Sequence, residues 1–207
     1  MTDNPNALTE SPTGSFRFYL QGMGVSSFAH GLQIVLFPWL LVGVLNEPAE
    51  RVGIAQMALM LPQLLFVLWG GVMSDNRHPG QHLFRLYLLY NLPCLLLMGT
   101  LWSGQLSFSV MLLYGVCFGT ITAFVQPARE SLLSRVVDSQ LQQAVARASF
   151  VQFTAQSAGI LLAGYMDRIG LLPLIALQLV MLTTSGWLLR NSLGYLPESS
   201  MGRRGST

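Results

Sequence analysis

The sequence predicts an all-α membrane protein with six transmembrane helices, and two observations carry this prediction. The first is composition, because 52% of the 207 residues are hydrophobic and only 10% are charged, whereas a soluble domain carries about 25% charged residues. The second is that long blocks contain no Asp, Glu, Lys or Arg, and about 20 apolar residues suffice for a helix to cross the hydrocarbon core. The blocks are residues 18–46, 52–74, 86–128, 148–166 and 169–189.

Each block predicts one membrane span except the third, which is about twice as long as the others and predicts two. A polar turn at residues 102–105, Trp-Ser-Gly-Gln, divides it near its middle. Helices are expected because lipid-exposed backbone must satisfy its hydrogen bonds internally, and these segments are too long and too uniformly apolar for barrel strands. The expected helices cover residues 18–44, 52–73, 83–101, 106–125, 143–166 and 171–189.

Polar tails flank the predicted bundle, which covers residues 16–190. The N-terminal tail, residues 1–15, carries Asp3 and Glu10 and lacks the basic region of a cleaved signal, so the first span is expected to be retained. The C-terminal tail covers residues 191–207.

The basic residues, all of them Arg, gather on one side of the predicted helices. Only Arg51 and Arg168 lie on the other side. Cytoplasmic segments of membrane proteins carry an excess of positive charge, so both termini and the connections 74–85 and 126–142 are expected to be cytoplasmic. The Arg residues on the predicted cytoplasmic side are Arg17, Arg77, Arg85, Arg129, Arg135, Arg147, Arg190, Arg203 and Arg204.

The longest inner connection, residues 126–142, has apolar residues at helical spacing. This pattern predicts either a short amphipathic helix on the inner surface or a helical extension of the fourth span. The apolar residues are Leu132, Leu133, Val136, Val137 and Leu141.

Small residues recur at four-residue spacing in the fourth and fifth spans. Such stripes let helix backbones approach closely. Because they also occur in ordinary helix packing, they predict a compact bundle and identify no function. The glycines expected at helix contacts are Gly71, Gly115, Gly119, Gly159 and Gly164.

Polar side chains inside the spans are candidates for a substrate pathway, because such groups avoid lipid and face a bundle interior or a wet cavity. They concentrate in the first, second, fourth and fifth spans, whereas the third and sixth spans are expected to be peripheral. The candidates are Gln21, His30, Gln33, Gln56, Thr122, Gln126, Gln152 and Gln156.

His30 is the one imidazole deep in a predicted span. It predicts either a group in proton coupling, because an imidazole titrates near physiological pH, or a neutral histidine packed between helices. No Asp or Glu lies deep in any predicted span, so the sequence does not support a proton-coupling mechanism.

The most specific local pattern follows the second span, where residues 71–77 read Gly-Val-Met-Ser-Asp-Asn-Arg. It resembles the loop between helices two and three of the major facilitator superfamily, Gly-x-x-x-Asp-Arg-x-x-x-Arg/Lys. Gly71 and Asp75 match, while Asn76 stands where that family has Arg, and Arg77 follows one place late. The resemblance implies a cytoplasmic latch between two halves of a transporter, with Asp75, Arg77 and Arg129 as candidate gating residues.

A second resemblance lies at the exit of the fourth span, where Pro127-Ala128-Arg129 is followed by residues 132–137, Leu-Leu-Ser-Arg-Val-Val. It is similar to the efflux branch that contains the enterobactin and macrolide exporters, with Ser134 replacing a second Pro. The fifth span keeps Gly159 and Gly164 of that branch's Gly-Pro-x-x-Gly-Gly pattern.

These resemblances imply a six-helix half built as a 3+3 inverted repeat, in the cytoplasmic (inner) membrane of a bacterium. The superfamily usually has twelve spans, with substrate bound between two halves. Three explanations for six spans are open: a truncated or split reading frame, a dimer of halves, or a separately encoded second half. The expected partners are therefore the lipid bilayer, a small-molecule substrate, and a second half or a second copy.

The leading functional prediction is secondary efflux of small amphipathic molecules by alternating access. The alternative is a non-transporting membrane subunit or remnant that binds a partner half. An enzyme is not expected, since no Gly-x-Ser-x-Gly, His-Glu-x-x-His or paired intramembrane Asp appears. The sequence also offers no phosphate-binding loop, no metal or cofactor motif, and too little net charge, +2, to argue for nucleic acid.

Overall fold

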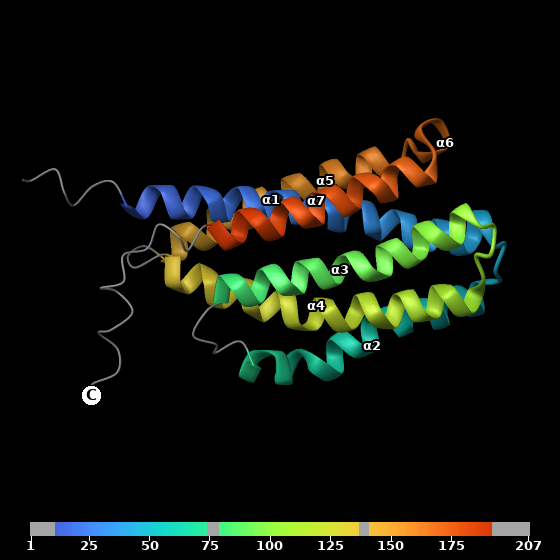
Figure 1. Cartoon of the computed structure of the whole chain (residues 1–207), viewed down its shortest axis with the longest axis horizontal. Helices are drawn as coiled ribbons and strands as arrows, with labels where there is room; N and C mark the ends of the chain where they lie inside the picture. Colours follow the sequence, from blue (N-terminus) through green and yellow to red (C-terminus); the bar gives the residue numbers. More distant parts are fainter. Residues whose placement is uncertain (1–10, 74–78, 137–140, 192–207) are drawn as a thin grey trace, which may run out of the picture.

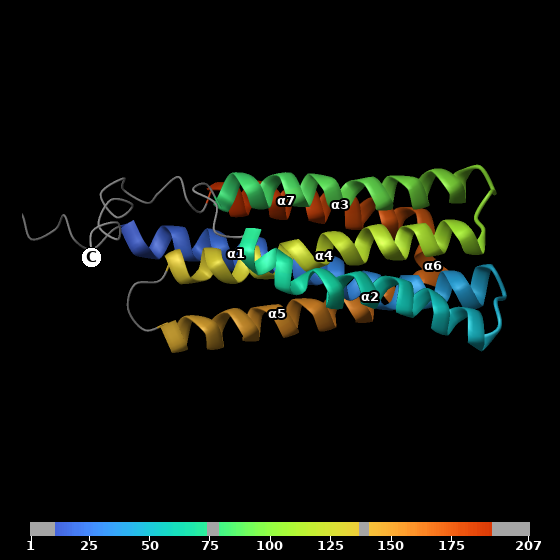
Figure 2. The same cartoon turned by 90° about the horizontal axis from the view of Figure 1, so that it is seen from below.

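The computed structural model describes residues 11–73, 79–136 and 141–191, and within these ranges every regular element is a helix. Six long helices lie alongside one another, with their axes along the length of the molecule (Figures 1 and 2). The helices are α1 (Ser11–Trp39), the π-helix η2 (Leu40–Val44), α2 (Ala49–Met73), α3 (Pro79–Trp102), α4 (Phe108–Val136), α5 (Leu141–Ala163), α6 (Met166–Ile169) and α7 (Leu171–Asn191).

The long helices lie where the charge-free blocks predict them, with differences at several ends, among them the start of α3 at Pro79 in place of residue 83. The first helix begins at Ser11, inside the predicted polar tail, and continues through η2 to Val44. The fourth helix extends to Val136, so the extension predicted as one alternative for residues 126–142 is present up to that residue. The fifth helix ends at Ala163, and a turn and α6 replace its predicted last residues.

Four of these helices are long and apolar enough to cross a membrane when the described residues are considered. Helix α5 contains polar residues that lower its mean hydropathy, namely Gln142, Gln143, Arg147 and Gln152. The four apolar segments are Phe16–Val44, His82–Trp102, Phe108–Leu133 and Leu171–Asn191. Many large apolar side chains on the outside of the bundle are exposed, as a lipid-facing surface requires, among them Met57, Leu64, Leu92, Phe150, Phe153 and Leu161.

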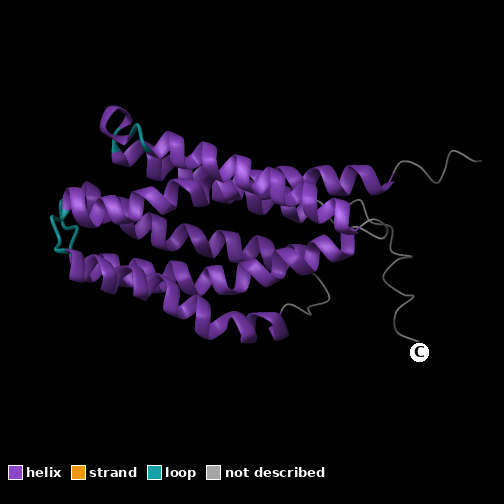
Figure 3. Ribbon diagram, turned by 180° about the vertical axis from the view of Figure 1, so that it is seen from behind, coloured by secondary structure: helices purple, strands orange, loops and turns teal. Residues whose placement is uncertain are grey.

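Neighbouring helices in the bundle are mostly not consecutive in the sequence. The principal contacts join α5 to α1, α1 to α7, α7 to α3, α3 to α4, and α4 to α2. The helices therefore form a curved row in that order, with α5 and α2 at its two ends and a smaller contact between α1 and α4. Figure 3 shows the same bundle from behind, with the turns of the described part of the chain, drawn in teal, at one end.

Three Arg residues of the predicted cytoplasmic side lie in the described helices near their outer ends: Arg17 in α1, Arg85 in α3 and Arg190 in α7. Helix α1 starts and α7 ends at the same end of the molecule (Figure 1). The two Arg residues of the opposite side, Arg51 and Arg168, lie in α2 and α6, beside the turns at the other end. There Arg51 forms an ion pair with Glu47 at 3.0 Å and lies over the ring of Phe108.

Glycines close two of the helix contacts. A Cβ on Gly119 would overlap the carbonyl oxygen of Leu59, so this glycine lets α4 lie directly against the backbone of α2, with Gly115 one turn earlier in van der Waals range of the same helix. Gly159 does the same for α5 against α1. Gly164 has a different role, because it lies in the turn after α5 and its nearest neighbours belong to its own helix.

Aromatic rings fill the core between α1, α3 and α4. The Tyr114 ring stacks between Phe37 and Phe118, and Tyr90 packs against Phe118 with ring centroids 4.8 Å apart. These side chains are buried. The aromatic core thus lies in the inner part of the row, and α2 and α5 form its ends.

Candidate functional site

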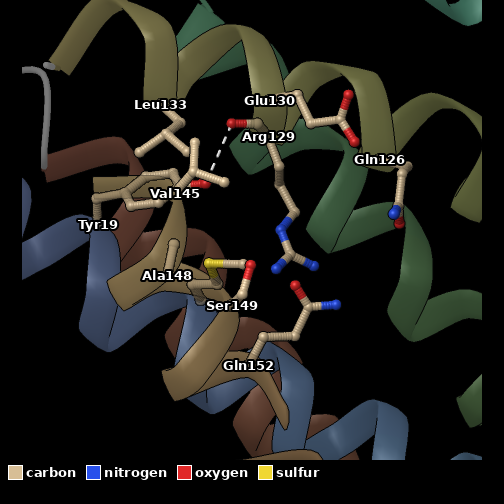
Figure 4. Close-up of a pocket in the computed structure, with 10 residues that line it drawn as sticks. Tyr19, Gln126, Arg129, Glu130, Leu133, Val145, Ala148, Ser149 and Gln152 are labelled. Atoms are coloured by element: carbon tan, nitrogen blue, oxygen red, sulfur yellow. Dashed lines mark hydrogen bonds between the residues drawn. The ribbon is translucent and has the colours of Figure 1, made fainter. Parts of the chain in front are cut away.

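Two adjoining pockets lie between the helices, with volumes of about 370 Å³ and 220 Å³. The larger is lined by α1, α4 and α5, and the smaller also by α2, α3 and α7, so the third and sixth spans contribute to it although they were expected to be peripheral. Gln126 and Arg129 of α4 and Gln152 of α5 line both of them. Figure 4 shows the larger pocket, in which side chains from α1, α4 and α5 converge. The shared residues place the two pockets side by side, with polar groups where they meet.

Arg129 is the central charged group of this region. Its guanidinium points into the pocket toward the amide of Gln152, while the carboxylate of Glu130 points away from it (Figure 4). Tyr19 donates a hydrogen bond from its hydroxyl to the backbone oxygen of Arg129 at 3.3 Å, which ties α1 to α4 beside the pocket. In the part of the chain that the structure describes, the one ion pair is Arg51–Glu47, so Arg129 has no acidic partner there.

The smaller pocket continues toward the middle of the bundle and is lined mainly by uncharged polar groups. Tyr90 and Thr122 share a hydrogen bond of 2.7 Å, and Thr122 also donates to the backbone oxygen of Phe118 at 2.8 Å. Ser27 and Tyr87 also line this pocket, and their buried hydroxyls have no hydrogen-bond partner. A buried hydroxyl without a partner costs about 1–3 kcal/mol, so water or a ligand group is expected beside them.

Five of the predicted pathway residues meet in these pockets: His30, Thr122, Gln126, Gln152 and Gln156. They come from α1, α4 and α5, so residues more than 120 positions apart in the sequence face one space. Three predicted pathway residues, Gln21, Gln33 and Gln56, lie outside both pockets.

The profile of a major facilitator family described as transmembrane secretion effector, MFS_3, matches residues 12–181. The chain belongs to this family. As a member, it is a multi-pass membrane protein of the transport class. No curated protein and no solved structure gave a match.

In this secretion-effector chain, Gln33 joins helices. Its buried Oε1 accepts hydrogen bonds from Tyr114 of α4 at 2.5 Å and from Gln178 of α7 at 2.9 Å. All three side chains are buried. One amide oxygen thus connects α1, α4 and α7, and this contact gives Gln33 a structural position in the bundle. Gln21 is exposed on α1, and Gln56 is half-buried on α2.

The predicted gate is described only in part. Arg129 lies in the pockets, whereas Asp75 and Arg77 fall outside the described residues. Gly71 belongs to α2, but its packing is likewise outside the description. The proposed latch in this member of the family therefore stays a prediction.

Several pocket residues of the secretion-effector chain were not among the predicted pathway residues. Gln63 of α2 carries the same signal as Gln56, a polar residue in an apolar span, and it lines the smaller pocket. Tyr19, Tyr87 and Tyr90 carry no such signal, because a tyrosine in a span is equally typical of a packed core. Their hydroxyls are identified as pocket groups only once the helices are in place.

Proposed function

We propose that the chain forms one six-helix half of a secondary exporter that moves small amphipathic molecules across the bacterial cytoplasmic membrane by alternating access. The observation that carries this proposal is the polar region around Arg129, which lies between α1, α4 and α5 of an otherwise apolar bundle. Polar groups inside a membrane bundle mark substrate paths by default. The secretion-effector family supports a transport or efflux role.

The helix contacts support a 3+3 inverted repeat. The repeat would pair α1 with α4, α2 with α5, and α3 with α7. Under this exchange, the α2–α4 contact corresponds to the α5–α1 contact, and the α1–α7 contact corresponds to the α4–α3 contact. The contact of α3 with α7 maps onto itself. Transporters with such repeats hold substrate where the repeats meet, and the pockets lie between equivalent helices, α1 and α4.

The proposed exporter works with a second six-helix half, supplied by the same polypeptide, another chain or a second copy. Helices α2 and α5 end the row on either side of the pockets and carry exposed apolar side chains. These helices are the edges against which a second half would close. The Arg-rich end, at which α1 starts and α7 ends, faces the cytoplasm in this proposal.

A transport assay in proteoliposomes tests the proposal. The full chain is reconstituted alone and, where a second half is identified, together with it. Movement of an amphipathic fluorescent dye is followed with and without a pH gradient. We expect transport by the wild type and its loss in Asp75→Asn, with protein incorporation measured as the control.

The alternative is a non-transporting subunit that binds a partner half. The observation that favours it is Asn76, which departs from the superfamily's Asp-Arg pair in the loop after α2. In that case the wild type would transport none of the dyes under any gradient, and Asp75→Asn would leave both transport and partner binding unchanged.

A further inference from the structure

Arg129 combines three properties that point to a ligand. Its side chain is half-buried in the wall of the larger pocket, it lies inside an apolar helix segment, and it has no acidic partner among the described residues. A charge removed from water is costly unless it is paired. An Arg that only anchored the helix would extend to the membrane surface, but this guanidinium turns into the pocket toward Gln152 (Figure 4).

The surroundings of the guanidinium suit an acidic head group on an apolar body. The amide of Gln152 lies in front of it, and Gln126, one turn earlier on α4, lines the same pocket, so both side chains offer N–H donors there (Figure 4). The guanidinium itself presents a planar fork of donors that matches carboxylate and phosphate geometry. The rest of the larger pocket is mostly apolar, with Met23, Leu133 and Val145 in its wall.

The charge arrangement favours an anion over a cation. Glu130 also borders the larger pocket, but it is exposed and its carboxylate points away from the space in front of Arg129 (Figure 4). A cationic ligand in that space would therefore meet the positive charge of Arg129 first. An anionic ligand would compensate this charge.

The smaller pocket supplies a second, independent indication of a ligand. The hydroxyls of Ser27 and Tyr87 line it without hydrogen-bond partners, and their side chains are 3% and 1% exposed. Because the two pockets share Arg129, a molecule whose acid group reaches the guanidinium can place further polar substituents beside these hydroxyls.

We propose that Arg129, Gln126 and Gln152 form an anion-binding subsite that selects amphipathic organic acids, molecules with one carboxylate, sulfonate or phosphate group on an apolar body. This inference rests on the proposed export function and narrows its substrate class. The acid group binds at Arg129, and the apolar body lies in the larger pocket against α1, the end of α4 and the start of α5.

Equilibrium binding tests the subsite without requiring transport. The full chain in phosphatidylcholine nanodiscs is titrated with 11-(dansylamino)undecanoic acid and with its methyl ester, which differ only in the charged group. We expect the acid to bind about tenfold or more tightly than the ester, since hydrogen bonds to charged groups contribute about 1.5–3 kcal/mol. Arg129→Gln should remove this preference and leave ester binding unchanged, whereas Arg129→Lys should keep part of it.

Arg147→Gln is the matched control. Arg147 is exposed, lies in α5 beside the pocket residue Ala148, and lines neither pocket itself. It should retain the wild-type preference for the acid. The subsite is refuted if Arg129→Gln binds the acid as the wild type does, or if acid and ester binding fall in parallel.

A second arm separates a transported acid from a membrane lipid of the same chemistry. The titration is repeated in nanodiscs that contain phosphatidylglycerol. Displacement of the acid by this lipid in the wild type but not in Arg129→Gln would assign the site to a lipid head group and overturn the substrate assignment. Acid binding at Arg129 without any transport would refute the export function alone, and dye transport without acid preference would refute the subsite alone.

Discussion

Gly31 and Gly159 close the contact between α1 and α5 from opposite sides. A Cβ on Gly31 would overlap the backbone oxygen of Gln156, and a Cβ on Gly159 would overlap that of Phe28. Each helix thus lies directly on the backbone of the other, which holds Gln152 and Gln156 of α5 beside α1. The pocket geometry therefore depends on two residues that have no side chain.

Enlarging either glycine should separate α1 from α5. We expect Gly31→Ala and Gly159→Ala to lower stability by about 1–3 kcal/mol, the usual cost of overpacking, measured as a lower thermal midpoint in mild detergent. Gly99→Ala and Gly53→Ala are the controls, because a Cβ at either position meets nothing within 4 Å. The controls should be neutral or stabilising by up to about 1 kcal/mol. Equal midpoints for all four variants would contradict the close contact.

Replacing Gln33 should weaken the bundle more than replacing an exposed glutamine. Gln33→Leu removes the acceptor for the Tyr114 hydroxyl and the Gln178 amide and leaves two buried donors unpaired. We expect a loss of about 1–2 kcal/mol, since hydrogen bonds between membrane helices contribute about 0.6 kcal/mol on average and up to about 2 kcal/mol. Gln21→Leu, on the exposed face of α1, should change the unfolding midpoint little.

A compensated variant separates this hydrogen-bond cluster from simple packing. Tyr114→Phe and Gln178→Leu, combined with Gln33→Leu, remove the donors together with the acceptor. The triple variant should recover part of the lost stability. No recovery would indicate that the shape of Gln33, and not its hydrogen bonds, holds α1, α4 and α7 together.

Replacing a pocket glutamine should reduce transport, whereas replacing the core glutamine Gln33 should reduce stability. Gln152→Leu and Gln156→Leu change half-buried pocket side chains that make no hydrogen bond to another helix within the described ranges. We expect each to reduce uptake of a transported acid severalfold while shifting the thermal midpoint little. The reverse pattern, lower stability with normal uptake, would move these residues from the pathway to the core.

The two ends of the bundle should be accessible from opposite sides of the membrane. Ser103 lies in the turn between α3 and α4, and Gln142 lies at the start of α5; both are exposed. With Cys94 and Cys117 changed to Ala, we expect a membrane-impermeant maleimide to label Ser103→Cys in intact cells and Gln142→Cys only in opened cells. Labelling of both positions in intact cells would contradict the predicted orientation.

Much of the fold could be predicted from the sequence, because a helix that crosses the membrane must be apolar and nearly free of charged residues. Charge-free blocks locate the helices, Arg placement predicts their direction, and small-residue stripes identify the glycines at the α2–α4 and α1–α5 contacts. The ends of the helices are harder to predict from the sequence than their positions, because polar residues such as Ser11 and Ser131 occur equally well inside a helix and beyond its end. Gly31 was missed because it lies in the first span, outside the stripes of the fourth and fifth spans from which contact glycines were predicted.

The site was predictable only as a set of polar residues and not as an arrangement. His30 and Gln33 are three positions apart on α1, yet one lines a pocket and the other lies in the core. The difference depends on which helices lie against each face, and sequence distance does not contain that information. Arg129 was found through a motif for gating, whereas its pocket, and the absence of an acidic partner among the described residues, emerge only from the packed helices.

The order of the helices in the row has a consequence for biogenesis. Helix α1 finds its principal neighbours only when α5 and α7 have been made, and α2 must wait for α4. During synthesis the amide of Gln33 therefore enters the bilayer long before Tyr114 and Gln178 arrive to donate to it. A chain that ended before α7 would therefore lack the Gln178 amide that donates to Gln33.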